Sequence, residues 1–343
     1  MASELLSRMI PVQTTITSKP SSNFKPTTTP PLSFLFASQH EQNHCSLFIF
    51  LKNGKSSPKS RILHLIPLCS ISSSNPPSTK EEAILQAKTS LLSTLEKPLN
   101  NPKLAGKLKK LKQPRLRVEI PITDDSPASL SQLAVEIFGK MPIKRKGPQI
   151  QSLIVWPNQS FTESAINAFD SRSSGVLVQN VDLSSILDED VRTVNSADVA
   201  VFMAPEASQL AVMKRVADNL YPKPVVIFNP KWAFEEEIEF DELSGFVGSF
   251  EVVYSFIGLE VRGILSKRKG VIFKCVSDGV LSGEKWDVLV EEEGQLRVVS
   301  RFKARPSITE VENVLYNLMA INSPVTKSAK FLKNLVSNVT GKK

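Results

Sequence analysis

Between residues 115 and 230 the sequence alternates short apolar runs with segments of helical periodicity, and this alternation constrains the fold more than any other feature. The runs are RLRVEIP, SLIVW, GVLVQNV, DVAVFMA and PVVIFNP. Each run is short and almost continuously apolar, which is typical of strands buried on both faces of a parallel sheet. The segments between them have the length and periodicity of crossover helices. The pattern predicts an α/β fold with a mainly parallel, Rossmann-like sheet flanked by helices.

After Trp232 the pattern changes, and apolar runs typical of β-strands follow one another directly. These runs are EVVYSFIGLEVRG, KGVIFKCVS, KWDVLVEEE and GQLRVVSRFKA. Short Gly-containing turns separate them and leave no room for crossover helices, so they predict an antiparallel β-meander that extends the sheet. Helical periodicity returns after Ser307 and predicts C-terminal helices.

Capping residues mark the expected helix starts. Ser126 followed by Pro127 begins one helix. An N-terminal amphipathic helix precedes the first strand, and we expect Pro98 and Pro102 to end it. The spacing of a capping box occurs at Ser78/Glu81, Ser160/Glu163 and Ser307/Glu310.

The first 79 residues are rich in Ser, Thr, Pro and Asn, and they contain seven basic residues but only two acidic ones. This composition is typical of an organelle transit peptide. A mitochondrial presequence is the alternative, but prolines from Pro20 to Pro31 prevent the amphipathic helix that such a presequence uses. We therefore expect a chloroplast transit peptide and localisation in the stroma or on the stromal face of the thylakoid.

Removal of this segment would take away all three histidines, His40, His44 and His64. Of the three cysteines only Cys275 would remain, in an apolar strand pattern where we expect a core residue. A Ser/His/Asp triad, a Cys/His zinc site and a haem histidine are then excluded.

Other cofactor signatures are missing as well. The sequence contains neither a G-x-x-x-x-G-K-[ST] loop nor a G-x-G-x-x-G turn after the first strand. Adjacent acidic residues such as Asp124 and Asp125 do not converge on one atom, so we expect no metal site, no cofactor and no catalytic residue. No run reaches the roughly 18 apolar residues that a membrane-spanning helix needs.

Ligands of open parallel sheets bind where loops leave the carboxyl ends of the strands. The weak candidates for such a site are Asn158, Ser160, Asn229 and Lys231, because helix starts and a lysine hold small anions. The alternative is structural: Asn158 and Ser160 cap a helix, while Trp232 covers the sheet edge.

The partner-binding candidates lie on surface features. They are Trp232, Arg262, Lys330, Leu332, Lys333 and Leu335. Residues 323–343 form a basic amphipathic segment that suits a thylakoid surface, a partner, or a closing helix packed on the domain. A basic run from Lys103 to Arg117 lacks the interleaved aromatic residues that stack on RNA bases, so nucleic acid is not the expected partner.

We expect four parts along the chain. Residues 1–72 form the transit peptide, and residues 73–115 form an N-terminal helix with a basic linker. Residues 116–322 form a single α/β domain, and residues 323–343 form the basic C-terminal segment.

The motifs VIFNPKW, SLIVWPNQS, ADVAVFMAPEAS and YSFIGLEVRG carry a family resemblance over about residues 79–321. The chain resembles a plant and cyanobacterial family of domains of unknown function. That family includes chloroplast low-photosystem-II-accumulation assembly factors and a domain fused to a chloroplast adenylate kinase. The resemblance implies a stromal or thylakoid-associated accessory protein, without catalytic residues to carry over.

From these observations we expect a noncatalytic chloroplast protein that assists photosystem assembly, above all of photosystem II. Its expected partners are photosystem II subunits or other thylakoid assembly factors. A small-molecule or nucleotide-binding enzyme on the Rossmann-like sheet is one alternative, and a plastid RNA-binding factor is another.

Overall fold

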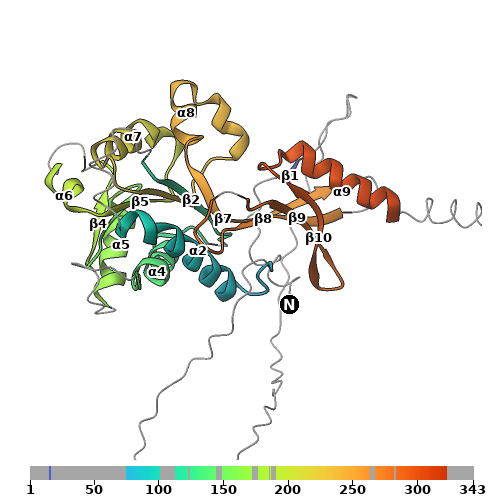
Figure 1. The fold of residues 1–343 in the computed structure, drawn as a ribbon, viewed down its shortest axis with the longest axis horizontal. Coiled ribbons are helices and arrows are strands. Elements are labelled where there is room, and N and C mark those ends of the chain that lie inside the picture. The colour runs from blue at the N-terminus through green and yellow to red at the C-terminus, as the bar shows by residue number, and fades with distance from the viewer. Residues whose placement is uncertain are drawn as a thin grey trace, which may run out of the picture. The chain divides into compact units, whose positions relative to one another are not determined.

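The computed structural model describes residues 15–16, 75–100, 113–122, 124–143, 149–171, 177–184, 186, 191–262, 267–281 and 283–322. One mixed sheet runs through this part of the chain, with helices on both faces (Figure 1). Its strands follow the order β10-β9-β8-β7-β2-β6-β5-β3-β4. The predicted α/β class is confirmed.

The parallel half of the sheet contains the strands expected from the apolar runs. They are β2 (Arg115–Glu119), β3 (Gln151–Trp156), β4 (Leu177–Asp182), β5 (Val199–Met203) and β6 (Val225–Phe228). Every neighbouring pair among them is parallel. All residues of β5 and β6 are buried, because helices cover both faces of these central strands.

The predicted meander consists of β7 (Glu251–Arg262), β8 (Lys267–Cys275), β9 (Trp286–Glu292) and β10 (Gln295–Phe302). Its strands pair antiparallel with one another. The first part of β7 also pairs in parallel with β2, from Glu251 to Ser255. The strand β1 (Thr15–Ile16) pairs in parallel with the far end of β7, at Glu260 and Val261. Strand β7 therefore joins the two halves of the sheet.

Two layers of helices cover the parallel half. Helices α2 (Lys80–Asn100), α4 (Pro127–Phe138) and α5 (Gln159–Asp170) contribute to one core cluster. Helices α6 (Val191–Ser196), α7 (Leu210–Asn219) and α8 (Ser244–Val247) contribute to the other cluster, on the opposite face (Figure 1). The short 3₁₀ helices are η2 (Ala207–Gln209), η3 (Phe234–Glu239) and η4 (Asp241–Leu243).

Helix α9 (Ile308–Asn322) covers the meander. Its Val311 and Leu315 pack with Leu259 and Val261 of β7. Helix α2 packs instead against Phe256 of the same strand. Since alternate side chains of a strand point to opposite faces, α2 and α9 cover opposite faces of β7.

Helix α2 is held to the sheet by a buried hydroxyl. Ser90 Oγ lies 2.8 Å from the carbonyl oxygen of Val253 and 2.6 Å from that of Val276. The N–H of Val276 also donates to Ser90 Oγ at 3.1 Å. The expected N-terminal helix is thus packed into the core of the α/β domain.

Two details of α2 differ from the sequence prediction. The carboxylate of Glu82, rather than Glu81, accepts hydrogen bonds from Ser78, and the N–H of Glu82 donates to Thr79 Oγ1. The helix also continues past Pro98 to Asn100, because buried leucines on either side of this proline hold the last turn against the core.

The remaining helix starts follow the prediction in two cases out of three. Ser126 caps α4, and Ser307 exchanges hydrogen bonds with Glu310 at the start of α9. For α5 the N-cap is Asn158 rather than Ser160, as in the structural alternative for Asn158, and its side chain accepts from the N–H of Phe161. None of the helices in the described residues is long and apolar enough to cross a membrane.

Candidate functional site

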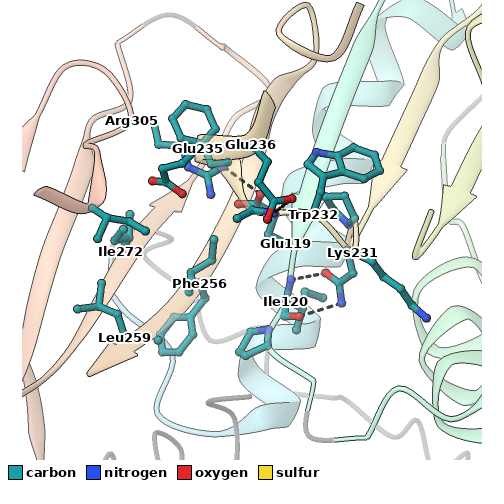
Figure 2. A pocket seen from close by; sticks show the side chains of 18 of the residues that line it. Glu119, Ile120, Lys231, Trp232, Glu235, Glu236, Phe256, Leu259, Ile272 and Arg305 are labelled. Atoms are coloured by element: carbon teal, nitrogen blue, oxygen red, sulfur yellow. Dashed lines mark hydrogen bonds and ion pairs between the residues drawn. The ribbon is translucent and has the colours of Figure 1, made fainter. Parts of the chain in front are cut away.

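A cavity of about 790 Å³ opens where the parallel half of the sheet meets the meander. Four segments line it: the end of β2 with its following loop, the loop after β6 with the start of η3, the second half of β7, and the start of α9. Figure 2 shows this cavity with its lining side chains. It lies at the carboxyl ends of β2 and β6, at the edge where the sequence predicted a site.

Asn229 lines the cavity, but its side chain is occupied. Its oxygen accepts the N–H of Ile120 at 2.7 Å, and its amide donates to the carbonyl oxygen of Ile120 at 2.8 Å. The two dashed lines at Ile120 in Figure 2 mark this pair. Asn229 has a φ of 49°, a conformation that asparagine adopts more readily than most residues. Asn229 therefore links the ends of β6 and β2, and its polar atoms point at the protein itself.

Lys231 also lines the cavity, but its amine points away from the other labelled side chains (Figure 2). The amine lies 3.9 Å from Asp125, 4.0 Å from Glu206 and 5.4 Å from the centre of the Phe161 ring. These contacts place it over the start of α5. Lys231 therefore joins neighbouring loops at the sheet edge instead of presenting its charge to the cavity.

Asn158 and Ser160 do not line the cavity. They follow β3, which is separated from β6 by β5. The loops after β3 and β5 do meet, because the amide of Gln209 donates to the carbonyl oxygen of Pro157 at 2.8 Å. Loops at the carboxyl ends of neighbouring strands therefore contact each other. The four side chains predicted to bind a ligand nevertheless do not line one cavity, since only Asn229 and Lys231 belong to it.

Trp232 is 6% exposed and belongs to a core cluster. Its indole N–H donates to Glu237 at 3.1 Å, and its ring packs edge to face with Phe240. Trp232 also lines the cavity, so most of its ring packs inside the protein and the remainder belongs to the cavity wall. Its position matches the prediction that Trp232 covers the sheet edge, and its role in partner binding stays a prediction.

The floor of the cavity contains a buried ion network that the sequence analysis missed. Arg117 of β2, 3% exposed, pairs with Glu119 at 2.7 Å and with Glu237 of η3. Ser255 of β7 donates to Glu119 at 2.6 Å. The pattern RLRVEI contained the signal, since Arg117 and Glu119 are charged residues on the same side of an otherwise buried strand.

Arg305 completes the network from the segment before α9. Its guanidinium lies 2.9 Å from Glu119 and 4.2 Å from the centre of the Phe234 ring. Figure 2 shows Arg305 and Glu119 on one side of the cavity. The network therefore joins β2, β7, η3 and the segment before α9, and three of its residues, Arg117, Glu119 and Arg305, line the cavity.

The pKa of Glu119 reflects this arrangement. Burial opposes ionisation of the carboxyl group, but the charges of Arg117 and Arg305 and the hydrogen bond from Ser255 outweigh burial and lower the pKa to about 2. The same carboxylates raise the pKa of Arg117 against the effect of its own burial. At neutral pH Glu119 is thus a paired carboxylate with little basicity.

This depressed pKa predicts a specific acid sensitivity. Because the folded pKa lies below the ordinary value of 4.5, Glu119 stabilises the fold above about pH 4.5, and this contribution is lost as the pH falls toward 2. We expect the free energy of unfolding to fall less between pH 5 and pH 3 in Glu119→Gln than in the wild type. Urea titrations at both pH values measure it, and equal losses would contradict the assignment.

The cavity is lined by more acidic than basic side chains. The carboxylates are Glu119, Asp125, Glu235, Glu236, Glu260 and Glu312, and the cations are Arg117, Lys231 and Arg305. The cations are already paired with carboxylates. Within the described residues, Oε1 of Glu312 is buried without a hydrogen-bond partner. The lining therefore favours a basic or hydrogen-bond-donating ligand over an anion.

Other reactive groups lie outside the cavity. Cys275 is buried as expected, and burial raises the pKa of its thiol to about 11. Burial likewise raises the pKa of the Tyr254 hydroxyl far above its usual value. The described residues contain no group of three or more His, Cys, Asp or Glu arranged to hold a metal ion.

Several predicted contact residues cannot be placed. Lys330, Leu332, Lys333 and Leu335 lie outside the described residues, as does most of the basic run that starts at Lys103. Arg262 is the last residue of β7, and only its backbone is described.

One comparison with known proteins agrees with the part of the resemblance that concerns a domain of unknown function. No curated protein matches the chain. One matching solved structure is the flagellar accessory protein FlaH from Methanocaldococcus jannaschii, which is 9% identical; the match covers 54% of this chain and 90% of FlaH, with a TM-score of 0.25. Residues 77–313 match the family described as a domain of unknown function, DUF1995. Because this match spans more than half of the sequence, the chain belongs to the DUF1995 family.

Proposed function

We propose that this chain is a noncatalytic accessory protein of the chloroplast that binds a protein partner in the cavity beside β7 and thereby assists photosystem assembly, above all of photosystem II. The observation that carries this proposal is the balance of charge among the side chains that line the cavity. Its two arginines are matched by the carboxylates of Glu119 and Glu237, while Glu235, Glu236 and Glu312 add further carboxylates to a lining that also contains apolar side chains. Such a lining suits a basic and apolar protein segment.

The chemistry of the cavity supports binding rather than catalysis. A general base requires a pKa near the working pH, whereas the pKa of Glu119 is about 2. A thiol nucleophile requires a lowered pKa, whereas the pKa of Cys275 is about 11. Asn229 and Lys231, which the sequence offered as ligand-binding groups, are engaged with other parts of the protein.

The chloroplast role rests on two sequence properties. Residues 1–79 have the composition of a transit peptide. The second is the resemblance of its motifs to a family that includes chloroplast low-photosystem-II-accumulation factors, with which the match to a domain of unknown function is compatible. Residues before and after the domain, including the basic segment 323–343, are available for a peripheral thylakoid contact in this proposal.

The two alternative functions receive less support. A nucleotide would bring negative charge into a cavity whose carboxylates are twice as numerous as its cations. For RNA binding, Arg115 and Arg117 are the described arginines of the basic run, and both pair with carboxylates of the protein. Phosphate recognition would have to compete with these pairs.

Affinity purification from plants tests the proposed function. The full chain with a C-terminal tag is expressed in a line that lacks the native copy, so that import and processing proceed normally. We expect photosystem II subunits or assembly factors to remain bound after a moderate salt wash, and photosystem II to accumulate poorly without the protein. Normal photosystem accumulation in the deletion line would refute the proposal.

A further inference from the structure

The cavity lies against the edge of β7 rather than against one of its faces. Six consecutive residues of this strand, Phe256 to Val261, line the cavity. Successive side chains of a strand point to opposite faces. A run of six lining residues therefore means that the cavity follows the backbone along the edge of the strand.

This edge is open for a defined length. Strand β2 pairs with β7 only as far as Ser255. On the other side, β8 pairs with β7 along its second half, from Tyr254 to Arg262. Between Phe256 and Leu259 the described part of the chain places no strand against the β2 side of β7. An edge of this kind presents unpaired backbone groups and is a template for an added strand.

The structure already contains a short strand on this edge. Thr15 and Ile16 pair in parallel with Glu260 and Val261. These two residues belong to the N-terminal segment whose composition predicts removal on import. The edge therefore accepts an extended segment in parallel, and removal of residues 1–72 would vacate it.

The surroundings of the edge indicate what kind of segment fits. Glu260 lies on the edge itself, and Glu235 and Glu312 line the same cavity. The apolar side chains of Phe256, Leu259 and Ile272 line the cavity as well. Oppositely charged residues that face each other across neighbouring strands stabilise the pairing.

We infer that the open edge of β7, from Phe256 to Val261, is a strand-addition site for an extended segment of a partner protein that runs parallel to β7 and places a basic side chain opposite Glu260. This inference rests on the proposed binding function and specifies the chemistry of the partner. Backbone hydrogen bonds provide affinity in this mode of recognition, and side chains at alternate positions provide selectivity. Thr15 and Ile16 of the chain's own N-terminal segment occupy the Glu260–Val261 end of this site.

The first part of the test uses the full chain and its own N-terminal segment as probe. A fluorescein-labelled peptide with the sequence of residues 11–20, PVQTTITSKP, is titrated with the wild type and with the double variant Thr15→Pro/Ile16→Pro. Proline lacks the N–H that a paired strand needs, so the variant cannot keep its own β1 on the edge. We expect the variant to bind the peptide at least about threefold more tightly, because an intramolecular competitor is removed.

The second part tests the register. In the observed pairing, Thr15 is opposite Glu260. A peptide with Thr15→Lys should therefore bind the double variant about fivefold more tightly than a peptide with Thr15→Glu. Adding Glu260→Lys to the protein should reverse this preference. Adding Glu251→Lys should leave it unchanged, because Glu251 is an exposed residue at the other end of β7, opposite Leu116 of β2.

The outcomes separate this inference from the proposed function. Reversal by Glu260→Lys and not by Glu251→Lys is the expected result, with cooperative unfolding of both variants, although Glu260→Lys is expected to lower stability slightly because it places a lysine opposite Lys269 of β8. An unchanged preference, or equal binding to the wild type and the double proline variant, would overturn the strand-addition site. Capture of photosystem partners by a protein with Glu260→Lys at wild-type levels would also overturn it, while leaving the binding function in place.

Discussion

Replacing Arg117 by Met is expected to lower the free energy of unfolding by about 3–5 kcal/mol. The substitution keeps most of the apolar volume but removes the charge that Glu119 and Glu237 share. Both carboxylates are less than a tenth exposed, so they would remain charged and uncompensated, or take up protons at a cost. Chemical denaturation at pH 7 measures the loss.

A matched control lies two residues earlier on the same strand. Arg115 pairs with Asp218 at 3.5 Å, at a position where Asp218 is half exposed. Arg115 also donates hydrogen bonds to Gln113 and Ser249, but its replacement leaves no buried carboxylate without a partner, so Arg115→Met should cost less than Arg117→Met. Equal losses for the two variants would show that the buried network does not hold the cavity walls together. A double variant with Arg117→Met and Glu237→Gln should recover part of the loss, because Glu119 keeps Arg305 as its partner and no carboxylate of the network is left without a cation.

Replacing Asn229 by Ala is expected to cost about 2–3 kcal/mol. Alanine removes both hydrogen bonds to Ile120, and each partly buried backbone group left unpaired costs about 1–3 kcal/mol. It also places a residue other than Asn or Gly at a φ of 49°, which adds strain. Thermal and urea unfolding measure the effect.

Glycine at the same position separates the two causes. Asn229→Gly loses the same hydrogen bonds but adopts a positive φ without a steric cost. We therefore expect its stability to lie between those of the wild type and Asn229→Ala. If Asn229→Ala were as stable as the wild type, Asn229 would not link β2 to β6, and its side chain would again be a candidate for ligand binding.

The strands of this fold can be predicted from the sequence because each one follows from a local pattern of apolar residues. The runs VVIF and VAVFM become β6 and β5, whose residues are all buried. The first residue of a helix was harder to predict where two residues with capping side chains are close together. At α5 both Asn158 and Ser160 suit an N-cap, and at α2 Ser78 and Thr79 do, so the correct one depends on how each helix meets the sheet.

The cavity was harder to predict from the sequence, because the segments that line it are far apart in the chain. Arg305 and Glu119 are separated by 186 residues, and no local pattern shows that they pair. The sequence did predict the sheet edge and two of its lining residues, Asn229 and Lys231. It did not show that β7 extends beyond β2, since the end of one strand relative to its neighbour is set by nonlocal pairing.

The central claim is that a protein partner binds in the cavity beside β7, and site-specific photo-crosslinking tests it most directly. A photoreactive amino acid is placed at Glu235, which lines the cavity, and separately at Ile238, which is 83% exposed on the same short helix and lies outside the cavity. After irradiation in chloroplast extract, a discrete crosslinked protein is expected at position 235 and not at position 238. The same crosslinked protein at both positions, or at position 238 alone, would contradict the account.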